Sequence, residues 1–157
     1  MLKRLQKELR TYRLQDDKCI TLVPDLDLHD WTATLCVTNS ESPFAGGCFQ
    51  LQLRIPDDYP LDPPSITFTT PVFHPNIHPT TGEICLDVLK TEWSAVWTLQ
   101  TVCLAILVLL DNPEPDSPLN CDAANLLRCG DRRAYRSMAS MFTKLHAIKK
   151  IEKRRVE

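Results

Sequence analysis

The sequence lacks the features that define several common classes of protein. Its 157 residues contain no Cys-x-x-Cys pair, so neither a zinc site nor a thioredoxin-like redox site is expected. The longest strongly apolar run, 102–110, is too short for a bilayer, which needs about 20 residues. The N-terminal MLKRLQKELR lacks the apolar centre of a signal peptide. We therefore expect one domain that stays in the cytosol without inserting directly into a membrane.

A basic face is also lacking, because the basic charge is concentrated at the two ends of the chain. Residues 1–18 carry six basic and three acidic side chains, and residues 144–157 carry six basic and two acidic ones. Domains that bind nucleic acid are usually basic across a whole face, so nucleic acid is not an expected partner. Solvated helix faces explain each basic end, and docking of a protein on the first helix is the alternative.

Seven cysteines are spread widely along the chain. Because no secretory signal precedes them, free thiols are the expected state. Free cysteine behaves as a small apolar residue, so most of the seven are expected in the core.

The hydrophobic pattern of the first half predicts a helix followed by a sheet. Apolar residues at helical spacing predict an amphipathic helix over residues 2–14. Four strand-like runs follow, most with the period-two alternation of a half-buried strand. They cover residues 19–23, 31–37, 48–55 and 65–69. Short turns between them favour an antiparallel meander.

The second half begins with an irregular segment over residues 71–97. Such a long segment inside a small domain is usually functional. The next run, 99–110, is apolar on nearly every side, which predicts a central buried helix with Thr98 as its N-cap.

Two shorter helical patterns complete the chain. Asn120 begins a short helix that runs through Leu127, and Gly130 separates it from a last helix. The apolar stripe of that last helix is Tyr135, Met138, Phe142 and Leu145. The predicted fold is therefore α+β: an N-terminal helix, a four-stranded antiparallel sheet, then helices packed on the sheet. We expect residues 1–148 to form the domain and residues 149–157 a basic C-terminal tail.

The irregular segment contains a cysteine with polar neighbours, in the run HPNIHPTTGEICLDVLK. Cys85 lies between two apolar residues, so the local pattern favours a buried core thiol. An amide such as that of Asn76, however, can stabilise the oxyanion of an acyl transfer. The nearby Glu83 and Asp87 disfavour a thiolate. That environment suits a thiol that receives an acyl group from another enzyme better than it suits a protease nucleophile.

His74 is the histidine closest in sequence to Cys85 that has the chemistry of a general base. A Cys/His hydrolase would require contact between the two side chains and a third group to orient the ring. Hydrogen bonds that fix the loop are the favoured role for His74.

Several motifs together resemble one enzyme family. HPNI, GEICLDVL, EWSAVWTL and NPEPDSPLN follow one another as in ubiquitin-conjugating enzymes, and SPFAGGCFQLQLRIPDDYPLDPPSITF resembles the upstream part of that family. The resemblance extends from Leu2 to Leu145. It implies the ubiquitin-conjugating fold and an enzyme that carries ubiquitin as a thioester. Its partners would be ubiquitin and the ubiquitin-activating enzyme. ATP is consumed upstream by the activating enzyme, so no cofactor or metal is expected on this chain.

The resemblance assigns roles to the HPN motif and to the cysteine. Cys85 matches the residue that forms the thioester with the ubiquitin C-terminus. Asn76 matches the asparagine that stabilises the oxyanion or braces the active-site loop. His74 and Pro75 match the structural part of the same motif.

Two further polar residues match family positions near the thiol. Asp87 and Ser117 would help to orient or deprotonate an incoming amine. For Ser117 and its neighbours, an ordinary turn is the alternative interpretation.

Two loops resemble those that contact RING ligases in this family. Their matching residues are Leu61, Trp93, Ser94 and Ala95. The family typically has Ser-Pro-Ala where this chain has Ser-Ala-Val at 94–96. The second loop is therefore expected to be less rigid than usual.

The runs HPTTGEICLDVLK and DSPLNCDAANLLRCGD resemble the peroxisomal members, the peroxin ubiquitin-conjugating enzymes. That branch implies transfer of ubiquitin to a lysine or cysteine of the peroxisomal import receptor during its recycling. It also implies a RING ligase and a membrane-anchored peroxin adaptor, which recruits the enzyme to the cytosolic face of the peroxisomal membrane. The alternatives are an inactive ubiquitin-binding scaffold, which typically lacks the cysteine, and the Cys/His hydrolase.

Overall fold

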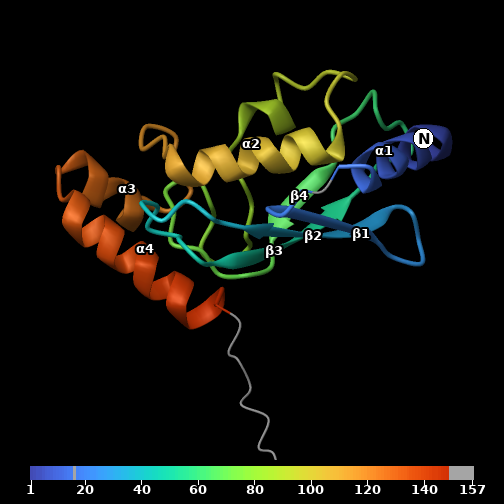
Figure 1. Ribbon diagram of the computed structural model, residues 1–157. Helices are drawn as coiled ribbons and strands as arrows, with labels where there is room; N and C mark the ends of the chain where they lie inside the picture. Colours follow the sequence, from blue (N-terminus) through green and yellow to red (C-terminus); the bar gives the residue numbers. More distant parts are fainter. Residues whose placement is uncertain (16, 149–157) are drawn as a thin grey trace, which may run out of the picture.

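The computed structural model describes residues 1–15 and 17–148 (Figure 1). The elements are α1 (Leu2–Arg13), β1 (Ile20–Pro24), β2 (Asp30–Cys36), β3 (Cys48–Arg54), β4 (Ser65–Phe68), the 3-10 helix η1 (Asp87–Leu89), α2 (Leu99–Asp111), α3 (Cys121–Arg128) and α4 (Arg132–His146). The predicted α+β class is confirmed, and each predicted element is present within two residues of its expected bounds.

The four strands form one antiparallel sheet in the order β1-β2-β3-β4, as the meander predicts. The registers place Trp31 opposite Leu53 and Leu35 opposite Phe49. All four of these side chains are at most 1% exposed. The period-two alternation therefore correctly predicts that one face of β2 and β3 is buried in the core.

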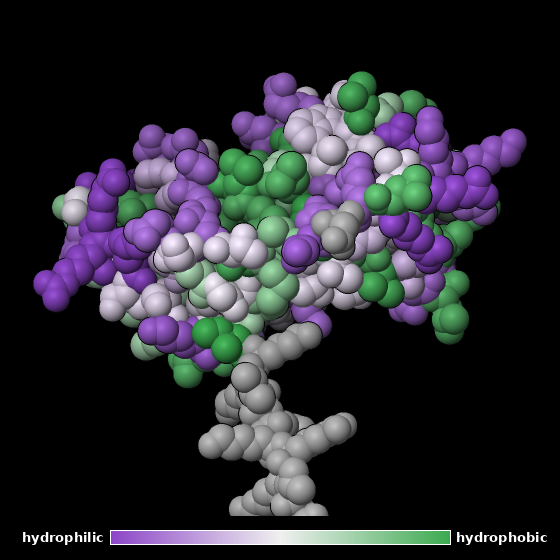
Figure 2. All heavy atoms as spheres, viewed as in Figure 1, coloured by the Kyte–Doolittle hydropathy of each residue, from purple (hydrophilic) through white to green (hydrophobic). Residues whose placement is uncertain are grey.

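Helix α2 lies across one face of the sheet (Figure 1). Its N-terminus is fixed by a capping box in which Thr98 and Thr101 satisfy each other's backbone N–H groups. The predicted central buried helix is present, but it is buried on one face only. Leu104 and Val108 are 53% and 56% exposed, and Figure 2 shows hydrophobic surface over the helix. A helix that covers one face of a sheet buries only the stripe it turns to that sheet.

The remaining helices lie at the two ends of the sheet, α1 at one end and α3 with α4 at the other (Figure 1). The side chains of Asn120 and Asp131 cap α3 and α4, and Gly130 between them has a φ of 78°. The prediction is wrong for one residue of the apolar stripe of α4, because Leu145 is 66% exposed. The side chains of α4 that are buried are Tyr135, Ala139 and Thr143.

The cysteines differ from the expectation that most are buried free thiols. Cys36 and Cys48 face each other in the register of β2 and β3, with 4.1 Å between their Cα atoms, and form a disulfide. Opposed residues of antiparallel strands are close enough for such a bond. Of the other five cysteines only Cys103 is buried, whereas Cys121 and Cys129 are exposed.

No helix within residues 1–15 and 17–148 is long and apolar enough to cross a bilayer. The predicted basic tail, 149–157, lies outside the described residues, so the boundary at residue 148 stays a prediction.

Candidate active site

A tight turn delivers Cys85 to its position. Ile77 and Ile84 pair across this turn, and Gly82 within it has a φ of 71°. A Cβ atom on Gly82 would lie 1.9 Å from the carbonyl oxygen of Phe68, so no other residue fits there without moving the backbone. The turn therefore fixes the path of the chain just before the cysteine.

Cys85 is half-buried, and its backbone N–H donates to the carbonyl oxygen of Asn76 at 2.8 Å. The contrast with Cys103 is chemical as well as geometric. Burial in the core raises the pKa of the Cys103 thiol to about 12, so that thiol stays protonated and inert. Cys85 is open to a partner from solvent.

The side chain of Asn76 is 1% exposed and is fully hydrogen-bonded. Its Oδ1 accepts from the backbone N–H of Glu114 at 2.8 Å. Its Nδ2 donates to the carbonyl oxygens of Glu114 at 2.7 Å and Ser117 at 3.2 Å. Both amide hydrogens are thus engaged, and Asn76 ties the loop between α2 and α3 to the segment that carries Cys85. Donation to an oxyanion would require the longer bond, to Ser117, to open.

His74 is fully buried, and both of its ring nitrogens are occupied. Nε2 lies 3.0 Å from the carbonyl oxygen of Leu109 and donates to it, while Nδ1 accepts the backbone N–H of Asn76 at 3.1 Å. Burial lowers the pKa of His74 to about 4, so the ring is neutral at physiological pH. This is the arrangement that the loop-fixing role requires, and it leaves neither nitrogen free to act as a base for Cys85.

Pro75 and Ser117 also lie at the loop between α2 and α3, and Asp87 lies just after Cys85 in the sequence. Pro75 is buried, and its carbonyl oxygen accepts the N–H groups of Leu119 and Asn120 at 2.8 and 3.0 Å. Ser117 is exposed, and the bond from Asn76 to its carbonyl oxygen holds it at the site. Asp87 is exposed at the start of η1. Within the part of the chain that the structure describes, neither of these two side chains hydrogen-bonds to Cys85.

The residues that match the ligase-binding loops lie together. The indole Nε1 of Trp93 donates to the carbonyl oxygen of Pro60 at 3.0 Å, which joins the two loops. Leu61 is 76% exposed beside this contact, and Ser94 and Ala95 are exposed on the other loop.

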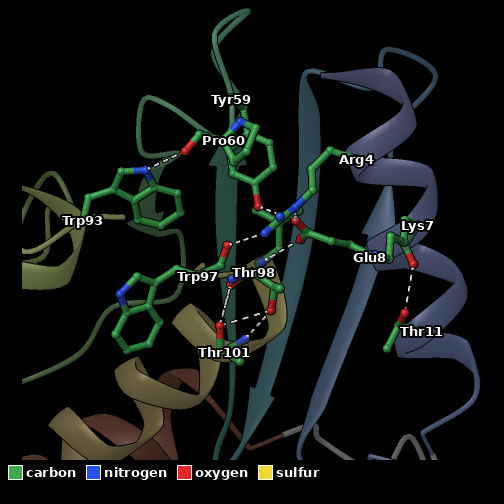
Figure 3. A network of polar contacts seen from close by, with 11 residues as sticks. Arg4, Lys7, Glu8, Thr11, Tyr59, Pro60, Trp93, Trp97, Thr98 and Thr101 are labelled. Carbon is green, nitrogen blue, oxygen red and sulfur yellow. Dashed lines mark hydrogen bonds and ion pairs between the residues drawn. The ribbon is translucent and has the colours of Figure 1, made fainter. Parts of the chain in front are cut away.

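Sequence reasoning missed the residue that fastens these loops to α1. The carboxylate of Glu8 is 9% exposed and accepts from the hydroxyl of Tyr59 at 2.8 Å and from the N–H of Leu99 at 2.9 Å (Figure 3). Burial raises the pKa of Tyr59, so its hydroxyl keeps the donated proton. The available signal was the position of Glu8, which lies within the apolar stripe formed by Leu5 and Tyr12.

Comparison with known proteins finds matches over most of the chain. The family model described as "Ubiquitin-conjugating enzyme" matches residues 4–143. The chain is 51% identical to Protein PEROXIN-4 of Arabidopsis thaliana over 92% of this chain and 91% of that protein. It is 49% identical to ubiquitin-conjugating enzyme E2 pex4 of Dictyostelium discoideum over 93% of this chain and 99% of that protein.

A solved structure gives the same result for the fold. The ubiquitin-conjugating enzyme Pex4p of H. polymorpha, determined in complex with the soluble domain of Pex22p, superposes with a TM-score of 0.87 at 36% identity. The match covers 93% of this chain and 97% of the other. The family model, the relatives and the fold agree, and the chain belongs to the ubiquitin-conjugating enzyme family.

Proposed function

We propose that Cys85 is the residue on which this ubiquitin-conjugating enzyme carries ubiquitin. The Cys85 sulfur attacks the carbonyl carbon of the thioester that joins ubiquitin to the activating enzyme. A new carbon–sulfur bond forms, the old one breaks, and the thiol of the activating enzyme leaves. The amine or thiol of a substrate then attacks the same carbonyl carbon, and Cys85 is released. No nucleotide or metal takes part on this chain, because the energy of ATP is already stored in the thioester.

The observation that carries this proposal is the joint anchoring of Cys85 and the neighbouring loop by Asn76. The backbone of Asn76 holds Cys85, and its side chain holds Glu114 and Ser117. Asn76 therefore fixes the loop at Glu114 and Ser117 relative to the residue that would carry the thioester. When a tetrahedral oxyanion forms, opening of the longer bond to Ser117 frees one amide hydrogen for it. Asp87 and Ser117 are both exposed, and they orient the incoming amine.

The decisive test is a thioester assay with purified components. The protein, ubiquitin, activating enzyme and ATP are mixed and resolved on a non-reducing gel. We expect one ubiquitin adduct that thiol reductant removes and that Cys85→Ala abolishes. Cys121→Ser is the matched control, since Cys121 is an exposed thiol of the same chain and its loss should leave the adduct intact.

Replacement of sulfur by oxygen separates this proposal from its rivals. Cys85→Ser should give an adduct that survives reductant, because an oxyester is not cleaved by thiols. A ubiquitin-binding scaffold would give no covalent adduct with either side chain. A Cys/His hydrolase would need His74 as its base, and both nitrogens of His74 are engaged by Leu109 and Asn76. An adduct in the unaltered chain that persists in Cys85→Ala would refute the assignment.

We propose further that the substrate is the peroxisomal import receptor and that the acceptor is a lysine or a cysteine. The support is the likeness to peroxin-4 proteins over more than nine-tenths of the chain. A RING ligase would bind the joined loops around Leu61 and Trp93. By analogy with Pex4p and Pex22p, a membrane-anchored adaptor would recruit the enzyme to the cytosolic face of the peroxisome.

The acceptor proposal is tested by discharge of the charged enzyme onto receptor fragments. A fragment whose lysines are all replaced by arginine should accept ubiquitin through a bond that reductant cleaves. A fragment without cysteine should accept it through a bond that reductant does not cleave. Failure of both fragments, with discharge to free lysine intact, would remove the receptor role and leave the conjugating activity standing.

A further inference from the structure

The loop between η1 and α2 has no proline in its turn, which reads Ser-Ala-Val-Trp at 94–97. Its tip, Ala95–Val96, is exposed, and Val96 is 87% exposed. The N–H of Trp97 donates to the carbonyl oxygen of Ser94 at 3.1 Å, which closes a four-residue turn. Without a fixed φ at its second residue, such a turn has more backbone freedom. Other contacts must therefore limit where its tip lies.

Those contacts come from α1. The guanidinium of Arg4 donates to the carbonyl oxygen of Trp97 at 2.8 Å and pairs with Glu8 at 2.5 Å (Figure 3). Glu8 also accepts the N–H of Leu99, the first residue of α2. The Arg4–Glu8 ion pair of α1 therefore contacts the chain on both sides of Thr98, at Trp97 and at Leu99.

The same carboxylate reaches the other exposed loop. Tyr59 is 1% exposed, and its hydroxyl donates to Glu8 at 2.8 Å. The next residue, Pro60, accepts the indole N–H of Trp93. Glu8 therefore sits where α1, the loop around Leu61 and the turn before α2 meet, and Figure 3 shows these side chains converging.

We propose that Glu8 is a positioning residue that holds this turn, which contains no proline of its own. It fixes the exposed tip at Ala95–Val96 relative to Leu61, and it thereby sets how strongly a RING ligase accelerates transfer of ubiquitin. This inference rests on the proposed function, because it assigns the two tips to the ligase. It assigns Glu8 no contact with ubiquitin or with the reacting atoms.

Glu8→Gln is the substitution that isolates this role. It keeps the shape of the side chain but replaces one acceptor oxygen by an amide that only donates. Arg4, Tyr59 and Leu99 all present donors, so one of the three bonds must be lost. Glu41→Gln is the matched control: Glu41 is exposed and lies at the opposite end of α2, where Ser42 bonds Asp111.

The experiment uses the full chain charged with ubiquitin and compares single-turnover discharge with and without a RING domain. The probe is the RING domain that accelerates the unaltered chain most strongly. For Glu8→Gln we expect charging and basal discharge to free lysine to stay within about twofold. Ligase-stimulated discharge should fall about tenfold, the factor that one charge-assisted hydrogen bond is worth. Glu41→Gln should behave as the unaltered chain.

A proline introduced into the turn supplies the readout that a merely structural role would not move. In the turn, Ala95 occupies the second position, where proline is favoured. Its N–H donates to no backbone oxygen in the part of the chain that the structure describes. Ala95→Pro should therefore recover most of the stimulated rate in the Glu8→Gln background. It should change the stimulated rate of the unaltered chain by less than about twofold, because that turn is already held.

Amide hydrogen exchange gives a second measurement that needs no ligase. Glu8→Gln should speed exchange at Tyr59 and Trp97 while leaving Cys85 as protected as before. Unchanged exchange at Tyr59 and Trp97, or faster exchange with no loss of stimulation, would overturn the inference. A chain that never forms the Cys85 thioester would instead refute the proposed function.

Discussion

The two ends of the molecule are each held by one buried polar side chain, but the two side chains differ in charge. At the Cys85 end, Asn76 is a neutral amide with 1% of its surface exposed. At the α1 end, Glu8 is a carboxylate with 9% of its side chain exposed and Arg4 beside it. Both make three side-chain hydrogen bonds to protein groups.

The difference lies in what each group can join. An amide carries a donor and an acceptor, so Asn76 satisfies both the N–H and the carbonyl of Glu114 and remains local to one loop. A carboxylate only accepts, so Glu8 must gather donors, and it takes them from α1, Tyr59 and Leu99. Asn76 therefore fixes the conformation of one loop, whereas Glu8 connects separate elements of the fold.

Of the substitutions considered, replacement of the Asn76 amide by a carboxylate should lower the free energy of unfolding most. Asn76→Asp replaces a donor that faces two carbonyl oxygens by a charged acceptor. We expect the free energy of unfolding at pH 7 to fall by about 4 kcal/mol, because two buried hydrogen bonds are lost and replaced by repulsion. Urea denaturation measures this change. The control is Asn125→Asp on the exposed face of α3, which should cost less than about 0.5 kcal/mol.

A small change for Asn76→Asp would mean that Nδ2 does not donate to Glu114 and Ser117. The comparison of the two ends would then fail, since Asn76 would no longer be the brace of its loop.

Low pH should reduce the free energy of unfolding, because His74 is buried in its neutral form near Asn76. Its pKa is about 4 in the folded chain and about 6.5 when unfolded, so the folded state binds the proton less tightly. The stability this confers is complete above pH 6.5 and is lost as the pH falls toward 4. At about 1.4 kcal/mol per pH unit, the loss by pH 4 is about 3 kcal/mol.

The measurement is urea denaturation between pH 4 and 7 for the unaltered chain and for His74→Gln. The variant should lack this part of the pH dependence, whatever its stability at pH 7. His146→Gln is the control for the loss of a histidine side chain as such, since His146 is exposed. Parallel pH profiles for the unaltered chain and His74→Gln would show that His74 is not the group that titrates.

Much of the fold could be predicted because its signals are local. The alternation of Trp31, Ala33 and Leu35 identifies the buried face of a strand from neighbouring residues alone. The caps at Asn120 and Asp131 are equally local. The exposed face of α2 was missed because its Leu and Val residues are of the same types as those that are buried. Only the packing partner decides which face of such a helix is covered.

The residues of the candidate site were likewise predictable where they lie in one motif, but not where they are far apart in the sequence. Cys85 and Asn76 lie in one motif, and their roles follow from its resemblance to a family. The hydrogen bond from the N–H of Leu99 to Glu8 spans 91 positions, and no periodicity in the sequence links two such residues. The Cys36–Cys48 disulfide was missed for a related reason. Alternation assigns each residue to a face of the sheet, but it does not give the register that sets two cysteines opposite each other.

The reverse exchange, Glu8→Gln, should cost less than Asn76→Asp. One charge-assisted bond is lost and no like charge is introduced, so we expect about 2 kcal/mol by urea denaturation. Because Arg4 is 30% exposed, about 1 M salt should screen the ion pair and shrink this cost. Loss of the Asn76 amide should not have a cost that depends on salt in this way, because the amide is uncharged. A Glu8→Gln cost that does not respond to salt would show that charge contributes nothing to this network.

The smallest expected effect is the stabilisation of the turn by Ala95→Pro. Proline at the second position restricts the unfolded chain, which should raise the free energy of unfolding by about 0.5 kcal/mol and the melting temperature by about 1–2 °C. Val96→Pro is the matched control and should destabilise, since proline is disfavoured at the third position of a common turn. The gain should be smaller in the Glu8→Gln background than in the unaltered chain, because there the proline also restricts a looser folded turn. Two substitutions that merely added would instead mean that Glu8 and the turn are energetically independent, although Arg4 and Leu99 connect them.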